Sequence, residues 1–161
     1  MGLKSHRFTH TLKEKKSYIY ICLESALQKD LQSFTDDIEK FSNSSTEELL
    51  LQLLKGYAKR FGESEESMFW LRTSYFPPDA FREQIIEKAN AHIENVGKLL
   101  FPIFKQANEQ SELHNIEVKD ALEAFLCLLD GLMVELLFAG LNRFETRLNA
   151  SWQVFWRGLS N

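Results

Sequence analysis

One stretch decides the fold of this chain: residues 121–140 read ALEAFLCLLDGLMVELLFAG. Its large apolar side chains fall on every face of a helix with about 3.6 residues per turn. Gly140 suits a helix end, so we expect a helix over residues 117–139. The charges of Glu123, Asp130 and Glu135 make it a poor membrane span, because a charge near a bilayer centre costs about 2.5–3.5 kcal/mol. Other helices, of the same chain or of a partner, must therefore cover it.

Apolar residues three or four positions apart predict helices through most of the remaining sequence. Pro77 and Pro78 make a hard stop, and Ser45 with Glu48 forms a capping box that starts another helix. We expect Gly62 to close that helix, and Pro102 to kink the longest helix or end it early. The sequence shows no alternating strand pattern. It predicts an all-α bundle of about six helices, over residues 15–41, 46–61, 64–75, 80–108, 117–139 and 142–158.

The composition is that of one globular domain. The chain has 161 residues, of which 44% are hydrophobic and 26% charged, and these values exclude disordered and collagen-like chains. Cys22 and Cys127 lie in apolar runs without metal-ligand spacing, so we interpret them as buried thiols of a reducing compartment. Residues 1–16 contain no apolar run typical of a signal peptide. These features predict a soluble, cytoplasmic protein without a membrane partner.

Charge is unevenly distributed along the chain. Five basic residues against Glu14 give residues 1–16 a net charge of +4, and the remaining residues carry −8, within a total of −4. Only the basic end could therefore approach a polyanion such as DNA. The alternative is that this end is simply a solvated terminus.

Motifs for catalysis or cofactor binding are absent from the sequence. It contains no glycine-rich phosphate loop, no dinucleotide-binding fingerprint and no zinc-protease motif. We expect no metal site at His6 and His10, no cofactor, and no enzymatic activity. An all-α enzyme would need a titratable cluster, for which only His92, Glu123 and Glu135 are eligible.

His92 lies on the apolar stripe of the helix expected over residues 80–108. One interpretation is a core histidine satisfied by one hydrogen bond. The other is a polar contact inside a cavity for a small apolar ligand, where a few polar groups orient the ligand. Taken singly, each nearby aromatic residue fits an ordinary core. As the walls of such a cavity, the candidate ligand-binding residues besides His92 are Phe69, Trp70, Tyr75, Phe76 and Phe125.

The last two helices predict a homodimer. The other helices of a small bundle cover only part of helix 117–139, and its free side would leave a large apolar patch. Pairing the last two helices with their copies about a two-fold axis gives a four-helix interface. The candidate interface residues are Leu122, Leu129, Met133, Leu136, Leu148, Trp152, Phe155 and Trp156.

Two stretches resemble the TetR family of one-component transcriptional regulators. Residues 2–16, GLKSHRFTHTLKEKK, are similar to the family's recognition-helix segment, which leads directly into a long connecting helix. Residues 121–140 and 152–159 are similar to its two dimerisation helices. Thr9 and Leu12 stand where the family usually has Tyr and Phe. These departures weaken the expected core of the small domain and its expected contact with DNA phosphates. The resemblance implies DNA-contacting roles for Lys4, Ser5, Arg7, Thr9, His10 and Lys15.

The resemblance further implies two parts: residues 1–14 as the remnant of a helix-turn-helix domain, and residues 15–161 as a ligand-binding and dimerisation domain. It implies a ligand-responsive repressor, in which a small apolar ligand shifts the helix over residues 15–41 and separates the DNA-reading heads. Two helices that should precede the recognition helix are missing, so we expect this chain alone not to bind an operator. The DNA operator is then a partner of an intact regulator only. The alternative is a truncated helical dimerisation module without ligand sensing.

Overall fold

A computed structural model describes the backbone of residues 3–160 and the side chains of residues 18–160. This part of the chain folds into six α-helices and one short 3-10 helix, without a strand. The predicted all-α helical bundle is therefore confirmed. In chain order the elements are α1 (Leu3–Lys40), α2 (Thr46–Glu63), α3 (Glu65–Tyr75), η1 (Asp79–Phe81), α4 (Arg82–Glu109), α5 (Val118–Ala139) and α6 (Leu141–Ser160).

The start of α2 follows the predicted capping chemistry in part. Ser45 is the N-cap, and its hydroxyl accepts a hydrogen bond from the Glu48 backbone N–H at 3.2 Å. The Glu48 carboxylate accepts from the Gln52 side chain instead of returning to Ser45. Of the two hydrogen bonds of the predicted capping box, only the one accepted by the Ser45 side chain is formed, and it satisfies a free N–H of the first turn.

Two predicted helix boundaries are wrong, and the helix that contains Pro102 does not end early. Helix α1 begins at Leu3 instead of Lys15 and runs without a break through the basic segment. Gly62 lies inside α2, because Ser64 ends this helix by donating its backbone N–H to the Arg60 carbonyl. Pro102 lies inside α4, which continues to Glu109. Leu100 and Phe104 are fully buried on either side of Pro102, so packing holds the helix across the missing hydrogen bond.

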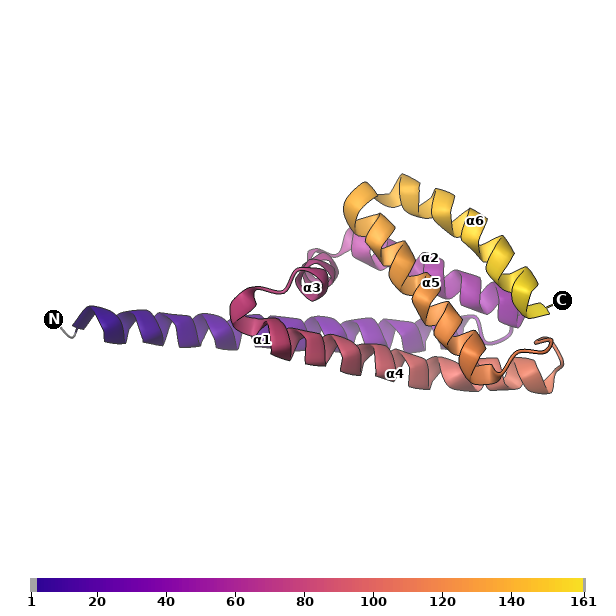
Figure 1. Cartoon of the computed structure of the whole chain (residues 1–161), viewed down its shortest axis with the longest axis horizontal. Helices are drawn as coiled ribbons and strands as arrows, with labels where there is room; N and C mark the ends of the chain where they lie inside the picture. Colours follow the sequence, from indigo (N-terminus) through magenta and orange to yellow (C-terminus); the bar gives the residue numbers. More distant parts are fainter. Residues whose placement is uncertain (1–2, 161) are drawn as a thin grey trace.

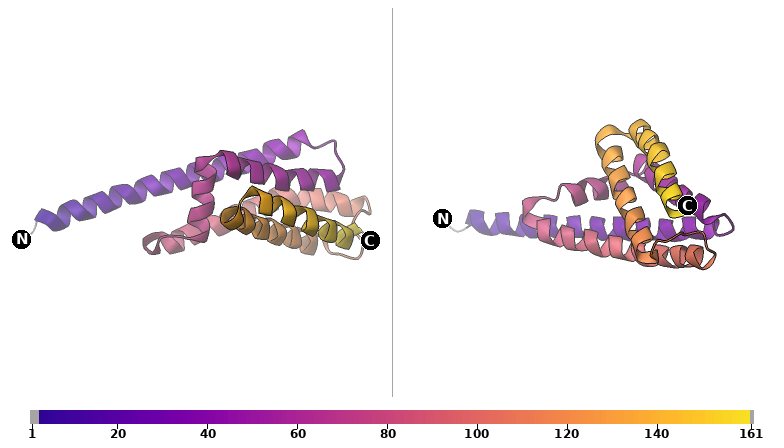
Figure 2. Two further views of the ribbon diagram at one scale, coloured as in Figure 1. Left: turned by 90° about the horizontal axis from the view of Figure 1, so that it is seen from above. Right: turned by 45° about the vertical axis from the view of Figure 1, so that its right-hand side comes forward.

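The bundle is built around the length of α1 and α4, which lie side by side (Figure 1). Helices α2 and α3 pack against α1, and the α5–α6 hairpin packs across α4 and α2. The N-terminal half of α1 extends well beyond the other helices in every view (Figures 1 and 2). The chain thus consists of a packed body and one projecting helical arm.

The core lies in the middle of this body. Burial of each large apolar side chain stabilises the fold by roughly 1.5–3 kcal/mol. The largest fully buried side chains come from five helices: Leu23, Phe34, Leu50, Leu53, Leu54, Phe61, Ile85, Leu100, Phe104, Phe125, Leu129 and Phe144.

A one-residue connection joins α5 to α6. Gly140 has a φ of 79°, in the left-handed region that favours glycine, and α6 begins at the next residue. The two helices are also linked by charge, since Glu135 of α5 forms ion pairs with Arg143 and Arg147 of α6, each at 3.3 Å. The predicted final helix pair is therefore a tight antiparallel hairpin.

Candidate functional site

A cluster of four charged or titratable residues lies where α1, α2 and α4 meet. The Nε2–H of His92 on α4 donates to Oδ2 of Asp30 on α1 at 2.9 Å. Nε of Arg60 on α2 lies 3.6 Å from the other oxygen of Asp30, and Nη1 of Arg60 lies 2.5 Å from Oδ2 of Asp37. We call Asp30, Asp37, Arg60 and His92 the Asp30 cluster.

Asp30 and His92 are taken out of solvent almost completely. Their side chains are 2% and 3% exposed, and the edge of the Trp70 ring packs against the His92 ring at a centroid distance of 5.7 Å. A buried carboxylate is costly unless it is paired, so the positions of His92 and Arg60 are tied to that of Asp30. The interpretation of His92 as a hydrogen-bonded core residue is therefore confirmed, with Asp30 as the partner.

Aromatic rings surround the guanidinium group of Arg60. Its carbon lies 5.2 Å from the Phe34 ring and 5.3 Å from the Tyr57 ring, within the range of cation–π attraction. Burial raises the pKa of Tyr57 well above its usual value, and the Asp30 charge raises it further. The cluster therefore combines fixed charge with a desolvated aromatic wall.

The contact between Asp30 and Arg60 is an ion pair without a hydrogen bond. Asp30 Oδ1 and Arg60 Nε are buried and find no hydrogen-bond partner among the described residues, because 3.6 Å separates them. A small shift of α1 relative to α2 would change this contact directly. The geometry thus makes the cluster sensitive to the position of α1.

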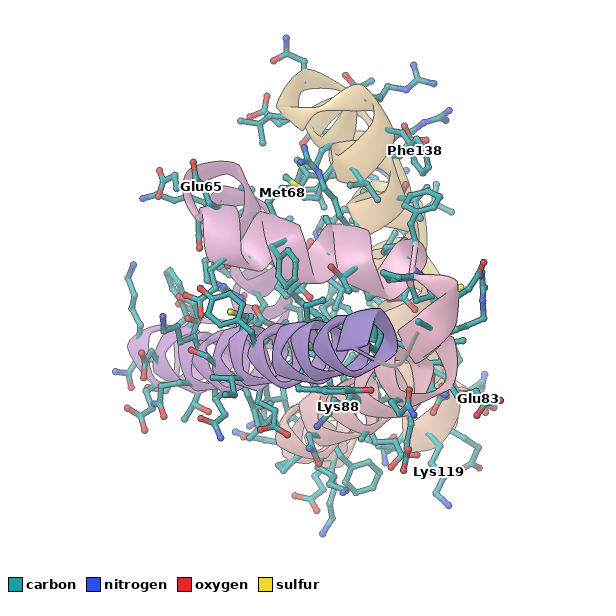
Figure 3. All side chains as sticks on the ribbon, turned by 90° about the vertical axis from the view of Figure 1, so that its left-hand side faces the viewer. Glu65, Met68, Glu83, Lys88, Lys119 and Phe138 are labelled. Atoms are coloured by element: carbon teal, nitrogen blue, oxygen red, sulfur yellow. The ribbon has the colours of Figure 1, made fainter. Side chains whose placement is uncertain are left out.

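Two further ion pairs fasten α1 at the surface of the body. Lys29 contacts Glu66 of α3 at 2.5 Å, and Glu24 contacts Lys88 of α4, which is labelled in Figure 3, at 2.6 Å. The hydrogen bond from Lys29 lowers the pKa of Glu66. Exposed pairs of this kind contribute about 0–1 kcal/mol each, so the buried Asp30 cluster carries more of the connection.

The structure brings only some of the predicted ligand-binding residues together. Trp70 and His92 touch each other, as described above. Phe125 is fully buried against Phe104, which lies about 18 Å along α4 from His92 at roughly 1.5 Å per residue. Phe125 therefore belongs to a different part of the core, and the prediction that it shares a cavity wall with His92 is wrong.

The other three aromatic candidates lie toward the surface. Phe76 is 60% exposed and packs edge-on against Phe138 at the end of α5. The Tyr75 hydroxyl donates to the backbone carbonyl of Asp130 at 3.2 Å. Phe69 is exposed and lines a shallow surface hollow between the end of α2 and α3. A sequence pattern places these residues near one another but does not fix the side of α3 on which each lies.

The residues predicted to form the dimer interface lie mostly inside the chain's own core. Phe155 and Trp156 are half-buried, and both pack against the Trp152 ring. The remaining six are each at most 7% exposed, so they are not available to a partner: Leu122, Leu129, Met133, Leu136, Leu148 and Trp152. The prediction that these six residues form a dimer interface is therefore wrong. The error arose because α6 and α4 together cover the most apolar face of α5.

A different apolar face of the same helices points to solvent. Val134 and Phe138 of α5 and Val154 of α6 are 37%, 68% and 75% exposed. Cys127 and Gly131 continue the α5 stripe toward its N-terminal end, and both are also exposed. The prediction that Cys22 and Cys127 are buried is therefore wrong, since Cys22 is only partly buried. We call Cys127, Gly131, Val134, Phe138 and Val154 the outer α5–α6 face, of which Phe138 is labelled in Figure 3.

The predicted DNA-contacting residues all lie on the projecting half of α1. Their side chains are outside the described residues: Lys4, Ser5, Arg7, Thr9, His10 and Lys15. Because α1 is continuous from Leu3 to Lys40, its backbone joins this segment rigidly to the Asp30 cluster. The boundary expected at residue 14 therefore coincides with no break in the helix.

Sequence reasoning missed Asp30 and Arg60. Asp30 follows Leu23 and Leu27 at helical spacing, so it lies on the apolar stripe of α1. Arg60 stands between the buried residues Tyr57 and Phe61. A charged residue on an apolar stripe was the available signal, and only the fold shows that both charges meet His92.

The fold and the site together define a class: an all-α bundle whose long first helix is fixed to the body by a buried charge cluster. Comparison with known protein families and with curated proteins finds no match to this chain. Among the described residues, no helix combines the length and apolar character needed to span a bilayer. Within the same residues, no three His, Cys, Asp or Glu side chains gather as metal ligands.

Proposed function

We propose that this chain is the sensing and dimerising body of a one-component transcriptional regulator of the TetR type. The similarity of residues 2–16 to a recognition-helix segment supports this proposal, as does the antiparallel pair α5–α6 at the C-terminal end. The observation that carries it is the geometry of α1. This one helix bears the basic segment at its free end and Asp30 inside the body.

Helix α1 would act as a lever. Twenty residues separate His10 from Asp30, which is about 30 Å of helix at roughly 1.5 Å per residue. A small rotation of α1 within the body therefore produces a displacement of several ångströms at the free end. Half-sites on DNA are read about 34–36 Å apart, so such a displacement is enough to disturb the register of two heads.

The ligand would act by changing how α1 is held. A ligand shifts an equilibrium only if it binds one arrangement more tightly than the other. A small apolar molecule entering beside Trp70 and His92 would separate His92 from Asp30 and alter the ion pair with Arg60. The binding event and the movement of α1 would thus be linked through the Asp30 cluster.

A second copy of the chain would supply the other head. The α5 members of the outer α5–α6 face are uncharged and exposed, and they are spaced four, three and four residues apart on one side of the helix, beside the exposed Asp130. Packing this face against its copy about a two-fold axis would cover it. The proposed dimer therefore uses residues different from those that the sequence indicated.

The proposal is tested with the full chain in two steps. A library of small apolar compounds is first screened for thermal stabilisation, since a ligand that binds only the folded state raises the melting temperature. Spin labels on Tyr18→Cys, in a Cys22→Ala and Cys127→Ala background that keeps the proposed interface apolar, then report the distance between the two α1 helices of a dimer. We expect a stabilising compound to change that distance. A compound that stabilises the chain without changing the distance between the two spin labels would contradict the proposed movement of α1.

A helical dimerisation module without a ligand is the second candidate function. It is favoured by the hydrogen bond of His92 to Asp30, which meets the polar requirement of His92 inside the chain, and by the complete burial of Phe125. For this module we expect a stable dimer that no compound of the library stabilises. The same two measurements therefore separate the two functions.

A further inference from the structure

A groove with a volume of about 510 Å³ runs along the outside of the bundle between α2 and α6. This volume lies in the range of about 300–1,000 Å³ that is usual for sites of small molecules. None of the residues that line it belongs to the Asp30 cluster. It is thus separate from the interior position considered for an apolar ligand.

The floor of the groove is apolar. Ala58 of α2 and Phe144 and Leu148 of α6 line it, and each is at most 2% exposed. Leu141, at the start of α6, is half exposed and extends the apolar surface at one end. The floor therefore suits an apolar chain better than a polar molecule.

One part of the rim is positively charged. Lys55 and Lys59 lie one turn apart on α2, both are exposed, and neither forms an ion pair with any described residue. Helices α2 and α6 run in opposite directions, so Lys55 lies toward Asn149 and the opposite end of the groove toward Leu141 (Figure 1). The groove is thus cationic at the Lys55 end, and Leu141 adds apolar surface at the other end.

Two carboxylates also line the groove. Glu63 lies on α2 one turn beyond Lys59, toward the Leu141 end, and Glu145 lies on α6 one turn beyond Leu141. Neither of them is paired with a groove lysine. Their positions favour a ligand whose anionic group lies at the Lys55 end, away from Glu63.

Gly62 keeps the groove open at its apolar end. It lies inside α2, where a glycine is less stable than alanine by roughly 0.5–1 kcal/mol. A Cβ atom placed on Gly62 would meet nothing within 4 Å, so no packing contact requires a glycine here. Gly62 therefore leaves room for a bound chain at this end of the groove.

From these features we propose that the α2–α6 groove binds an anionic amphiphile with a single apolar chain, such as a medium-chain carboxylate. The chain lies over Ala58, Phe144 and Leu148 and points toward Gly62 and Leu141. The carboxylate lies between Lys55 and Lys59, where each ammonium group donates a charge-assisted hydrogen bond. This site does not depend on the proposed regulatory function.

Calorimetric titration of the full chain with decanoate, below its micelle-forming concentration, tests the site. We expect saturable binding of one molecule per chain. The double variant Lys55→Glu and Lys59→Glu is expected to bind decanoate at least about tenfold more weakly, as for loss of a charge-assisted contact. The matched control is Lys98→Glu and Lys119→Glu, which changes two lysines that line a similar apolar groove between α4 and α5 and leaves the affinity unchanged.

A second pair of variants tests the apolar end. Gly62→Leu fills the groove and is expected to abolish decanoate binding, whereas Gly158→Leu on α6, also in open space, is expected to preserve it. Melting curves of all variants establish that they fold. Equal binding of decanol and decanoate would overturn the proposal, as would an equal loss of affinity in a variant and its matched control, or the absence of saturable binding.

Discussion

His92 Nε2 lies 2.9 Å from Asp30 Oδ2, although 62 positions separate the two residues in the sequence. The contact fixes α4 to α1 in the interior, and Arg60 joins it from α2. Three helices therefore depend on one carboxylate. The same helix α1 also carries the basic segment at its projecting end.

Replacing Asp30 by Asn removes this charge while keeping the size of the side chain. Arg60 then retains only Asp37 as an anionic partner, in a site where its own side chain is 18% exposed. We expect the free energy of unfolding to fall by about 3 kcal/mol, as for a broken buried ion pair. Urea denaturation followed by circular dichroism measures this loss. Asp36→Asn, at an exposed position on the same helix, is the control, and it should change the free energy by less than about 0.5 kcal/mol.

Alanine substitutions at the two glycines of α2 should have opposite effects. A Cβ on Gly56 would lie 2.6 Å from Asp37 Oδ2 and would push Asp37 off Arg60, so we expect Gly56→Ala to destabilise the chain by about 1 kcal/mol. Gly62 has open space around it, and Gly62→Ala should stabilise the helix by roughly 0.5–1 kcal/mol. Melting temperatures of the two variants make the comparison. Shifts of the same sign would contradict the packing described for Gly56.

The chain should lose stability above pH 10. Burial raises the pKa of Tyr75 to about 12, and it raises the pKa of Tyr57 as well. The folded state therefore keeps phenolic protons that the unfolded state releases, and the free energy of unfolding falls as the pH rises from 10 toward 12. Urea denaturation at several pH values should show a smaller fall in Tyr57→Phe and Tyr75→Phe. Tyr18→Phe, at a highly exposed position, should leave the fall unchanged.

A charge on the outer α5–α6 face should prevent the proposed dimer. Val134→Glu places a carboxylate in an apolar contact, where it would be buried without a partner. We expect the dimer dissociation constant, measured by sedimentation equilibrium, to rise by about a hundredfold or more, which corresponds to about 3 kcal/mol. Ile86→Glu, at an exposed apolar position on α4, is the matched control and should leave the constant unchanged. A chain that sediments as a monomer at micromolar concentration would rule out this interface.

The helices themselves could be predicted because their signals are local. Ser45, Pro77 and Gly140 mark helix ends through hydrogen bonds and backbone angles that involve only their neighbours. Gly62 misled the prediction, since a following cap outweighed its weak helix propensity, and packing carries α4 past Pro102 without the early end that the sequence allowed. Propensity is a local preference of less than a few kcal/mol, and burial of large side chains readily exceeds it.

The candidate site was only half visible in the sequence. His92 stood out as a polar residue on an apolar stripe, and the structure confirms that it is a core residue with a hydrogen bond. Asp30 lies on the apolar stripe of α1, but its position on that stripe does not show that His92 is its partner. Which carboxylate of α1 meets His92 depends on how α1 and α4 are aligned along their length.

The sequence by itself determined that this chain is helical, where most helices begin and end, and which residues are apolar enough to be buried. The tertiary structure alone decided which apolar face of α5 is covered by α4 and α6, and which one, including Val134 and Phe138, remains exposed. The reason is that a helix apolar on all sides carries no preference for one direction in its own pattern. Its orientation follows from the packing of all its neighbours at once.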